Sequence, residues 1–303
     1  MTEPHDPDAC PAPVRVLVPA QAWLGEGPLW CDLVQGLYWC NIEAGELWRW
    51  QAADGQVQHW SLPGTLGSLA LTATPGVLLV ALTDSVALFD TARGQLGPRQ
   101  PVPVPAGARL NDGRCDPQGR FIVGPYHYDE ASRSPWYRIG PGLQVEVLSA
   151  LPAPIVANSL AFSPDGRQLY FSDTPSGMIW RADYAQDAAG QAIGTPTAFA
   201  QLSPDEGWPD GATVDALGQL WVALWGGGAV QGFGPDGTRL DRLQMRSAHP
   251  TCPTFGGPGL ATLFVTSARK ALEAHERSAQ PHAGDVYALP AAVPGLPAYR
   301  YRP

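Results

Sequence analysis

Turn glycines divide this chain into repeats of similar length. Each of these glycines is followed by an apolar strand, a short polar break and a second strand. A period of 40 to 52 residues in mostly β sequence matches the blade of a β-propeller, whereas a β-sandwich leaves it unexplained and a parallel β-helix repeats at a shorter length. We therefore predict an all-β fold, a six-bladed β-propeller that forms one domain over residues 1–303, with residues 1–14 as an irregular N-terminal segment. The six glycines are Gly36, Gly76, Gly119, Gly166, Gly218 and Gly259.

The strands themselves are predicted from short segments rich in aromatic and β-branched residues and bounded by Gly, Asp, Pro or Ser. The 34 glycines and 32 prolines of the chain provide the turns that many short strands need. Residues 267–280 have a helix-like composition, and we expect a loop with about one turn of helix there. The predicted strands cover residues 36–42, 46–50, 77–82, 86–90, 120–124, 168–174, 178–183, 219–225, 229–233, 262–268 and 285–290.

Charge and composition exclude several classes of partner. The formal net charge is −9 and charged residues make up 16% of the chain, so we expect neither a nucleic-acid partner nor a membrane partner, both of which favour basic patches. The N-terminal sequence has no secretory signal and no apolar run approaches the roughly 18 residues of a membrane span, which predicts a cytoplasmic protein. A closed propeller exposes few sheet edges, and we therefore expect a monomer.

The five cysteines, Cys10, Cys31, Cys40, Cys115 and Cys252, are odd in number and lack the CxxC spacing of metal sites. We interpret them as free thiols rather than as disulfides or metal ligands.

Polar residues recur at one position of the repeat. Asn111, Asn158 and Asp210 each lie eight residues before a turn glycine, and Glu26 lies ten residues before Gly36 in a slightly longer version. Equal offsets in repeats mean equivalent places in the fold, and the innermost strand of each blade lines the central channel. The same count in the two remaining repeats gives Ser68 and Thr251. The sequence thus predicts a ring of six polar side chains around the propeller axis.

The ring contains a candidate metal site. Glu26, Asn158 and Asp210 offer three oxygen ligands, of which two are anionic. Hard oxygen ligands suit Ca²⁺, Mg²⁺ or Mn²⁺, and Zn²⁺ and Fe²⁺ also accept them. Three protein ligands leave coordination positions for water and substrate, as catalytic sites do. Each residue alone is more typical of a turn or strand end, and the shared offset is what favours one divalent metal ion.

Five segments of the chain carry a family resemblance. They are GEGPLW (25–30), RLNDGRCDPQGRF (109–121), NSLAFSPDGRQLYFSDT (158–174), PDGATVDALGQLWVALWGGGAV (209–230) and CPTFGG (252–257). In this order they resemble the motifs of the gluconolactonase/regucalcin family, the senescence marker protein-like sugar lactonases. The match spans nearly the whole chain. The resemblance implies a six-bladed propeller with one divalent metal ion on its axis.

The resemblance also implies roles for individual residues. Glu26, Asn158 and Asp210 would be the metal ligands, and Asp210 would also be the general base. Asn111 would lie beside the metal and contact substrate or a metal-bound water. Arg109 would hold substrate oxygens.

Two departures from the family pattern accompany these roles. Ser159 follows Asn158 where many relatives have glycine, which suggests a changed backbone at this point. Residues 125–136 also differ from relatives. Within them, Asp129 falls where a substrate-contacting acid is sometimes found. His127 and Tyr128 could also reach the mouth of the pocket, but we expect them on the loop surface.

The implied activity is hydrolysis of a sugar lactone to the sugar acid. A metal ion polarises the lactone carbonyl and acidifies water, and a carboxylate accepts the proton. The chain lacks the GxSxG motif of serine esterases. Three alternatives stay open: a calcium-binding regulatory propeller without significant turnover, an interaction scaffold, and a two-calcium propeller esterase, for which the ring has too few acidic positions. The sequence leaves the particular aldonolactone and the native metal undetermined.

Overall fold

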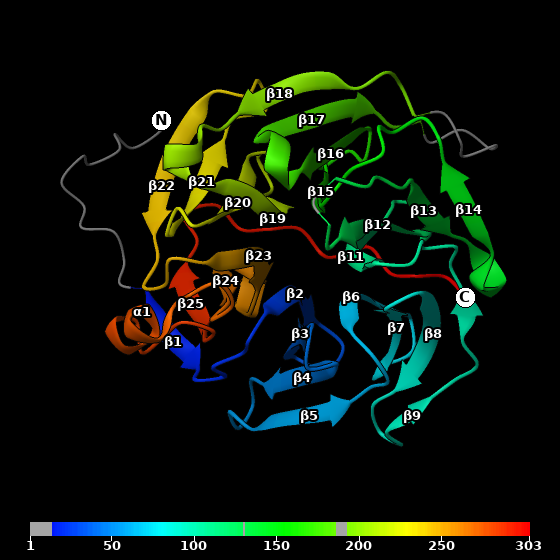
Figure 1. Cartoon of the computed structure of the whole chain (residues 1–303). Coiled ribbons are helices and arrows are strands. Elements are labelled where there is room, and N and C mark those ends of the chain that lie inside the picture. The colour runs from blue at the N-terminus through cyan, green and yellow to red at the C-terminus, as the bar shows by residue number, and fades with distance from the viewer. Residues whose placement is uncertain (1–13, 130, 186–192) are drawn as a thin grey trace.

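Six antiparallel sheets surround a central axis and form a six-bladed β-propeller (Figure 1). The structure, a computed structural model, describes residues 14–129, 131–185 and 193–303. The predicted fold class is confirmed. The irregular segment expected at residues 1–14 lies outside the described residues except for Val14, and so does Cys10.

Each sheet has its innermost strand at the axis, and the following strands lie progressively further out. In chain order, the first three sheets consist of β2 (Gly25–Cys31), β3 (Gly36–Asn41), β4 (Glu46–Gln51) and β5 (Val57–Ser61); of β6 (Leu66–Leu71), β7 (Val77–Leu82), β8 (Ser85–Asp90), β9 (Gln95–Leu96) and β10 (Gln100–Pro101); and of β11 (Ala108–Cys115), β12 (Phe121–His127), β13 (Trp136–Ile139) and β14 (Val145–Leu148).

The next three sheets complete the ring. They consist of β15 (Ala157–Phe162), β16 (Gln168–Asp173), β17 (Met178–Asp183) and β18 (Thr197–Gln201); of β19 (Trp208–Val214), β20 (Leu220–Trp225), β21 (Ala229–Phe233) and β22 (Arg239–Gln244); and of β23 (Pro250–Gly256), β24 (Thr262–Ser267), β25 (Val286–Pro290) and β1 (Arg15–Val18). Because β1 pairs antiparallel with β25, the first strand of the chain completes the last sheet and closes the ring.

Helical structure is limited to short pieces. The helix α1 (Ala274–Ala279) lies within the segment for which we expected about one turn of helix. Short 3-10 turns occupy η1 (Pro141–Leu143), η2 (Thr174–Ser176), η3 (Pro204–Glu206) and η4 (Pro258–Leu260). Among the described residues, no helix has the length and apolar character needed to cross a membrane.

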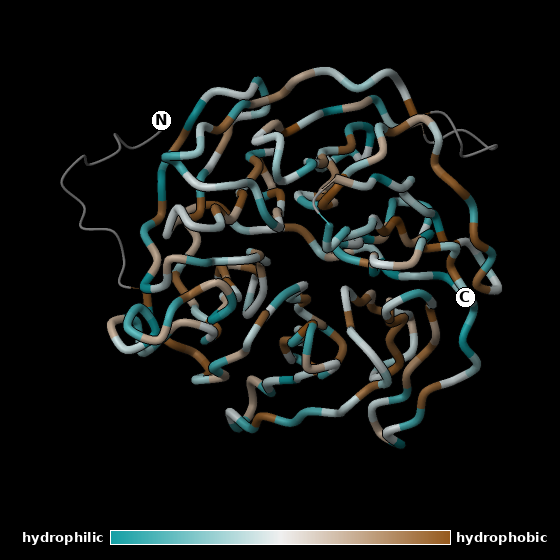
Figure 2. Tube along the Cα trace, in the orientation of Figure 1, coloured by the Kyte–Doolittle hydropathy of each residue, from teal (hydrophilic) through white to brown (hydrophobic). Residues whose placement is uncertain are grey.

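Hydrophobic clusters fill the spaces between neighbouring sheets. Side chains alternate between the two faces of a strand, so a strand with a sheet on either side needs apolar residues at every position. In β7, Leu78 and Val80 pack toward the preceding sheet, whereas Leu79 and Ala81 pack toward the following one. The described residues form one such cluster at each of the six junctions. Figure 2 shows these hydrophobic residues along the strands and hydrophilic residues at many peripheral turns.

The described cysteines, Cys31, Cys40, Cys115 and Cys252, are free and buried, as expected.

The predicted strands agree with the second and third strands of the sheets, except that β13 was not predicted. None of the innermost or outermost strands was predicted. β2, β6, β11, β15, β19 and β23 contain glycines, prolines or polar residues that interrupt their apolar pattern. Their hydrogen bonds and the sheets on both sides determine their conformation, so composition alone does not identify them.

The C-terminal segment after β25 crosses one end of the propeller, as the red trace in Figure 1 shows. It is held by backbone hydrogen bonds from Gly295 to Leu260, from Tyr301 to Leu71 and from Arg302 to Gly119. The segment therefore links three different sheets.

Candidate metal and substrate site

All six predicted ring residues lie on the innermost strands, near the strand starts. The register of each of these strands against its neighbour shifts by one residue at or beside the ring position. Such bulges redirect side chains and are common next to active sites. The ring residues are Glu26 on β2, Ser68 on β6, Asn111 on β11, Asn158 on β15, Asp210 on β19 and Thr251 on β23.

The two carboxyl groups of the ring meet. Glu26 and Asp210 are hydrogen-bonded to each other, and Gly27 donates its backbone N–H to Oε2 of Glu26 at 2.7 Å. Burial and, to a smaller extent, the charge of Asp112 raise the pKa of Glu26 to about 7. Burial, followed by the charge of Glu26, raises the pKa of Asp210 well above its usual range. Two buried acids in contact resist full ionisation, and a cation beside them would remove that resistance.

The two amide side chains of the ring also meet. Nδ2 of Asn111 donates to the carbonyl of Ala157 at 2.8 Å and to Oδ1 of Asn158 at 3.3 Å. Nδ2 of Asn158 donates to the hydroxyl of Thr174 at 2.8 Å, and that hydroxyl donates to the carbonyl of Pro209. Because the contact with Asn111 is long, Oδ1 of Asn158 keeps acceptor capacity for another group.

Arg109 lies beside the ring, fully buried. Its Nη1 donates to Oδ1 of Asn111 and to the carbonyl of Leu110, while its Nε has no hydrogen-bond partner. The guanidinium stacks on Tyr126, 4.3 Å from the ring centre, and lies 6.0 Å from the ring centre of Tyr128. Both tyrosines are thus neighbours of the buried guanidinium, and Tyr128 itself is half exposed.

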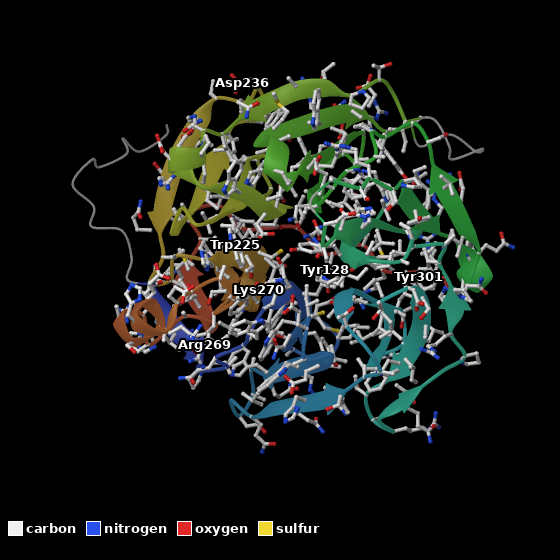
Figure 3. The ribbon with its side chains drawn as sticks, in the orientation of Figure 1. Tyr128, Trp225, Asp236, Arg269, Lys270 and Tyr301 are labelled. Atoms are coloured by element: carbon white, nitrogen blue, oxygen red, sulfur yellow. The ribbon has the colours of Figure 1, made fainter. Side chains whose placement is uncertain are left out.

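Aromatic and charged side chains surround this end of the axis. The imidazole of His249 stacks on Trp225 with ring centres 4.2 Å apart. Lys270 pairs with Glu43 and places its Nζ 5.3 Å from the ring centre of Tyr126. Figure 3 shows Tyr128, Trp225 and Lys270 around the centre of the propeller.

Ser159 takes the backbone conformation that glycine would take. Its φ is +56°, as is that of Gly27, which follows Glu26 at the equivalent position of the first sheet. The Ser159 hydroxyl donates to the carbonyl of Asp210 at 2.6 Å and accepts a hydrogen bond from Ser172 at 2.9 Å. The backbone change expected from this departure is therefore not observed, and the serine connects β15 to β19 beside Asp210.

Asp129 lies in the exposed loop after β12. Its carboxylate accepts hydrogen bonds from the backbone of Ala131 and from the backbone and hydroxyl of Ser132, which lower its pKa to about 2. His127, expected on the loop surface, is instead buried and bonded to Ser134. That expectation was wrong because His127 is the last residue of β12 and its backbone N–H binds the carbonyl of Ile155.

Comparisons with known proteins identify the family of this chain and agree with its fold. Residues 24–269 match the family model described as the SMP-30/gluconolactonase/LRE-like region. The chain belongs to this family. It is 39% identical to L-arabinolactonase of Azospirillum brasilense, over 92% of each chain, and 38% identical to 6-deoxy-6-sulfogluconolactonase of Pseudomonas putida, over 93% of this chain and 96% of the relative. The solved structure of a calcium-binding protein, regucalcin, from Agrobacterium tumefaciens is 32% identical, superposes with a TM-score of 0.89, and covers 97% of this chain and 98% of its own.

This member of the SMP-30/gluconolactonase/LRE-like family has a third acid in the channel that sequence reasoning missed. Asp112 is buried, and its carboxylate accepts a hydrogen bond from the backbone of Leu160 at 2.9 Å. Burial raises its pKa, and its charge raises those of Glu26 and Asp210. In the sequence, Asp112 could have been noticed because it directly follows Asn111. Consecutive strand residues normally point to opposite faces, however, and only the bulge in β11 brings the side chains of Asn111 and Asp112 toward β15.

The donor set fits a hard divalent cation. Glu26 and Asp210 supply two carboxylates, and Asn158 supplies an amide oxygen. Within the described ranges, no three His, Cys, Asp or Glu side chains are grouped as metal ligands are, so an ion here needs the amide oxygen. Glu26, Asn158 and Asp210 each keep a small exposed fraction, between 3 and 9%. A small ion in the channel can therefore reach them.

Proposed function

We propose that this protein is a metal-dependent hydrolase that opens the ring of a sugar lactone to give the sugar acid. The observation that carries the proposal is the contact between the buried carboxyl groups of Glu26 and Asp210, with the amide of Asn158 on the neighbouring strand. Membership of the family and the names of the two bacterial relatives, both lactonases, support the substrate class.

Glu26, Asn158 and Asp210 would hold one divalent ion. When bound there, the ion would polarise the lactone carbonyl and lower the pKa of water. Its charge would also keep the Asp210 carboxyl ionised despite its burial, which is the form a base requires. Asp210 would then accept the proton of the attacking water, and that proton would pass to the ring oxygen as the ester bond breaks.

Arg109 and Asn111 would orient the substrate. Asn111 already presents its amide to Asn158, and the guanidinium of Arg109 binds Oδ1 of Asn111. In the present arrangement Arg109 is 1% exposed and stacks on Tyr126, so contact with a substrate oxygen requires the side chains that bury it to shift. The Nε of Arg109 would then gain the partner that it now lacks.

Asp129 retains its proposed substrate contact only if its loop rearranges. Its carboxylate is occupied by backbone and hydroxyl groups of the same loop. Arg109 and Asn111 are therefore better supported as substrate-binding residues than Asp129 is.

The calcium-binding regulatory protein is the second candidate. It is favoured by the similarity to the structure named as a calcium-binding regucalcin, because carboxylate and amide oxygens also suit Ca²⁺. Metal binding is common to both candidates, and turnover separates them.

The deciding experiment measures acid release from a panel of 1,4- and 1,5-aldonolactones by the chelated protein and after addition of Ca²⁺, Zn²⁺, Mn²⁺, Mg²⁺ or Fe²⁺. We expect activity to disappear with chelator and to return with at least one metal. Metal binding without turnover of any lactone would favour the regulatory protein. Full activity after exhaustive chelation would refute the metal dependence.

A further inference from the structure

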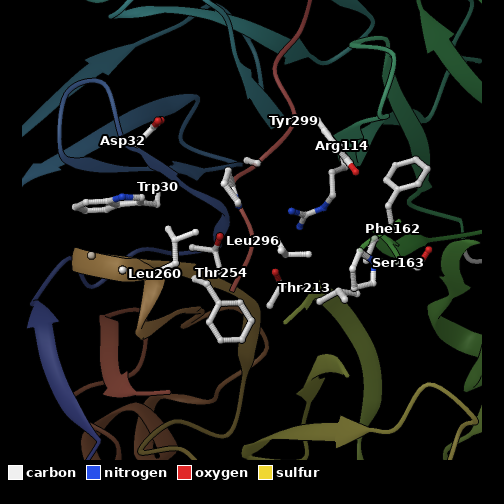
Figure 4. Close-up of a pocket in the computed structure, with 18 of the residues that line it drawn as sticks. Trp30, Asp32, Arg114, Phe162, Ser163, Thr213, Thr254, Leu260, Leu296 and Tyr299 are labelled. Atoms are coloured by element: carbon white, nitrogen blue, oxygen red, sulfur yellow. The ribbon is translucent and has the colours of Figure 1, made fainter. Parts of the chain in front are cut away.

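A cavity of about 660 Å³ opens at the end of the channel opposite to the ring (Figure 4). The two ends are distinguished by position along the innermost strands. Glu26 and Asn158 lie near the starts of β2 and β15, whereas the cavity is lined by Trp30 and Phe162 near the ends of the same strands. The cavity is therefore separate from the candidate metal site.

Arg114 supplies the positive charge of this cavity. Its Nε donates to the carbonyl of Leu160 at 2.7 Å and its Nη2 donates to the carbonyl of Ala212 at 2.8 Å, which fixes the guanidinium across the channel. A guanidinium has five N–H donors, so three are left for another acceptor. No ion pair to Arg114 is formed by any carboxylate in the described part of the chain.

The nearest acids already have partners. Asp32, at the rim of the cavity, forms an ion pair with Arg300 of the C-terminal segment. Asp112, on the same strand as Arg114, accepts the hydrogen bond from Leu160. An incoming anion would thus meet a guanidinium that no carboxylate contacts directly, although the charge of Asp112 is close enough to interact with it.

Two hydroxyl groups face the same space. Thr213 and Thr254 line the cavity, and neither hydroxyl has a hydrogen bond within the described structure. Figure 4 shows both threonines and the guanidinium of Arg114 pointing into the cavity. Both hydroxyls are therefore free to donate a hydrogen bond to an acceptor that enters the cavity.

Apart from Asp32, Gln35 and Ser163, the remaining walls are apolar. They come from Trp30 and Phe162 on the strands, from Leu260 of η4, and from Leu296 and Tyr299 of the C-terminal segment. A cavity of this volume, with apolar walls and a few convergent polar groups, is typical of small-molecule sites.

We infer that this cavity is a second ligand site, which binds a small organic acid with an apolar ring. The carboxylate contacts Arg114, Thr213 and Thr254, and the ring lies between the aromatic and leucine side chains. One cation and two neutral hydroxyls match a single negative charge. A phosphate dianion would be under-neutralised, particularly in a chain with a formal net charge of −9.

The test uses phenylacetate as the probe and calorimetry of the full chain, both chelated and metal-loaded. We expect saturable binding at one site, unchanged by metal. Phenylacetamide should bind about tenfold more weakly or worse, because hydrogen bonds between charged groups are the stronger ones. Binding that requires the metal, equal affinity for the amide, or no saturation up to about 10 mM would overturn the site.

Variants locate the binding. Arg114→Met removes the cation, but it also removes two hydrogen bonds between innermost strands. A loss of binding in this variant could therefore come from a loss of folding, so a second variant is used. Leu296→Trp instead fills the cavity from its rim, and Leu240→Trp on β22 is the matched control, because the two leucines are 38% and 37% exposed. We expect Leu296→Trp to lower the affinity about tenfold and Leu240→Trp to change it less than about twofold, one tenfold step being 1.4 kcal/mol. Unchanged affinity in Leu296→Trp would place the ligand elsewhere and refute the proposal.

Discussion

Replacing Ser159 by alanine or by glycine tests how β15 and β19 are held together beside Asp210. The serine hydroxyl donates to the carbonyl of Asp210 and accepts from Ser172, both within the buried interior. Its backbone has φ of +56°, a conformation that costs an L-residue about 1–2 kcal/mol and costs glycine little. The two substitutions therefore share the loss of the hydrogen bonds and differ in whether the backbone strain remains.

Ser159→Ala removes both hydrogen bonds and keeps the backbone strain. At about 0.5–1.5 kcal/mol for each bond, we expect a loss of about 1–3 kcal/mol in the free energy of unfolding. Ser159→Gly loses the same bonds but relieves the strain. It should therefore be about 1 kcal/mol more stable than the alanine variant, after allowance for the greater freedom of glycine in the unfolded chain.

Urea unfolding of the metal-loaded protein, followed by tryptophan fluorescence, measures both differences from the transition midpoint at constant slope. Ser278→Ala is the control, because its hydroxyl is exposed and bonds within α1, so a change below about 0.5 kcal/mol is expected. A Ser159→Ala variant as stable as the parent would show that these hydrogen bonds do not stabilise the junction. A glycine variant less stable than the alanine variant would refute the account based on backbone strain.

Three further predictions concern the candidate site. Asp210→Asn should lower kcat by about 10²–10⁴-fold, and saturating metal should restore activity only in part; complete rescue would show that Asp210 is a ligand and not the base. Arg109→Ala should raise KM and leave metal affinity, measured by calorimetry, unchanged, because arginine is not a ligand; loss of the metal would show that Arg109 organises the ligands. In the metal-free protein, the raised pKa of Glu26 means that the contribution of this residue to stability is fully present below its ordinary pKa and is lost as pH rises toward about 7, by on the order of 3 kcal/mol. Thermal unfolding between pH 4.5 and 7.5 measures this fall, and an identical fall in Glu26→Gln would exclude Glu26 as its source.

The number of blades and the location of the ring followed from the sequence, because both depend on local signals that repeat. Turn glycines such as Gly119 and Gly218 adopt positive φ at equivalent turns, and the aspartates of these turns, Asp116 and Asp215, accept the same pattern of backbone hydrogen bonds. A fixed distance in sequence from such a turn is a fixed distance along an antiparallel strand. The residues at that distance therefore reach equivalent places on the innermost strands.

The contacts within the ring were decided by the tertiary structure. Which side chains meet across the axis depends on the packing between sheets and on the bulges, and these arise from hydrogen bonds and burial between residues far apart in sequence. The Glu26–Asp210 contact, the presence of Asp112 in the channel and the burial of Arg109 under Tyr126 are of this kind. So are the pairing of β1 with β25 and the C-terminal segment that, by crossing one end of the propeller, helps to line the cavity around Arg114. Local periodicity specifies where a residue lies along its strand, and only the closed ring of sheets specifies which residue it faces.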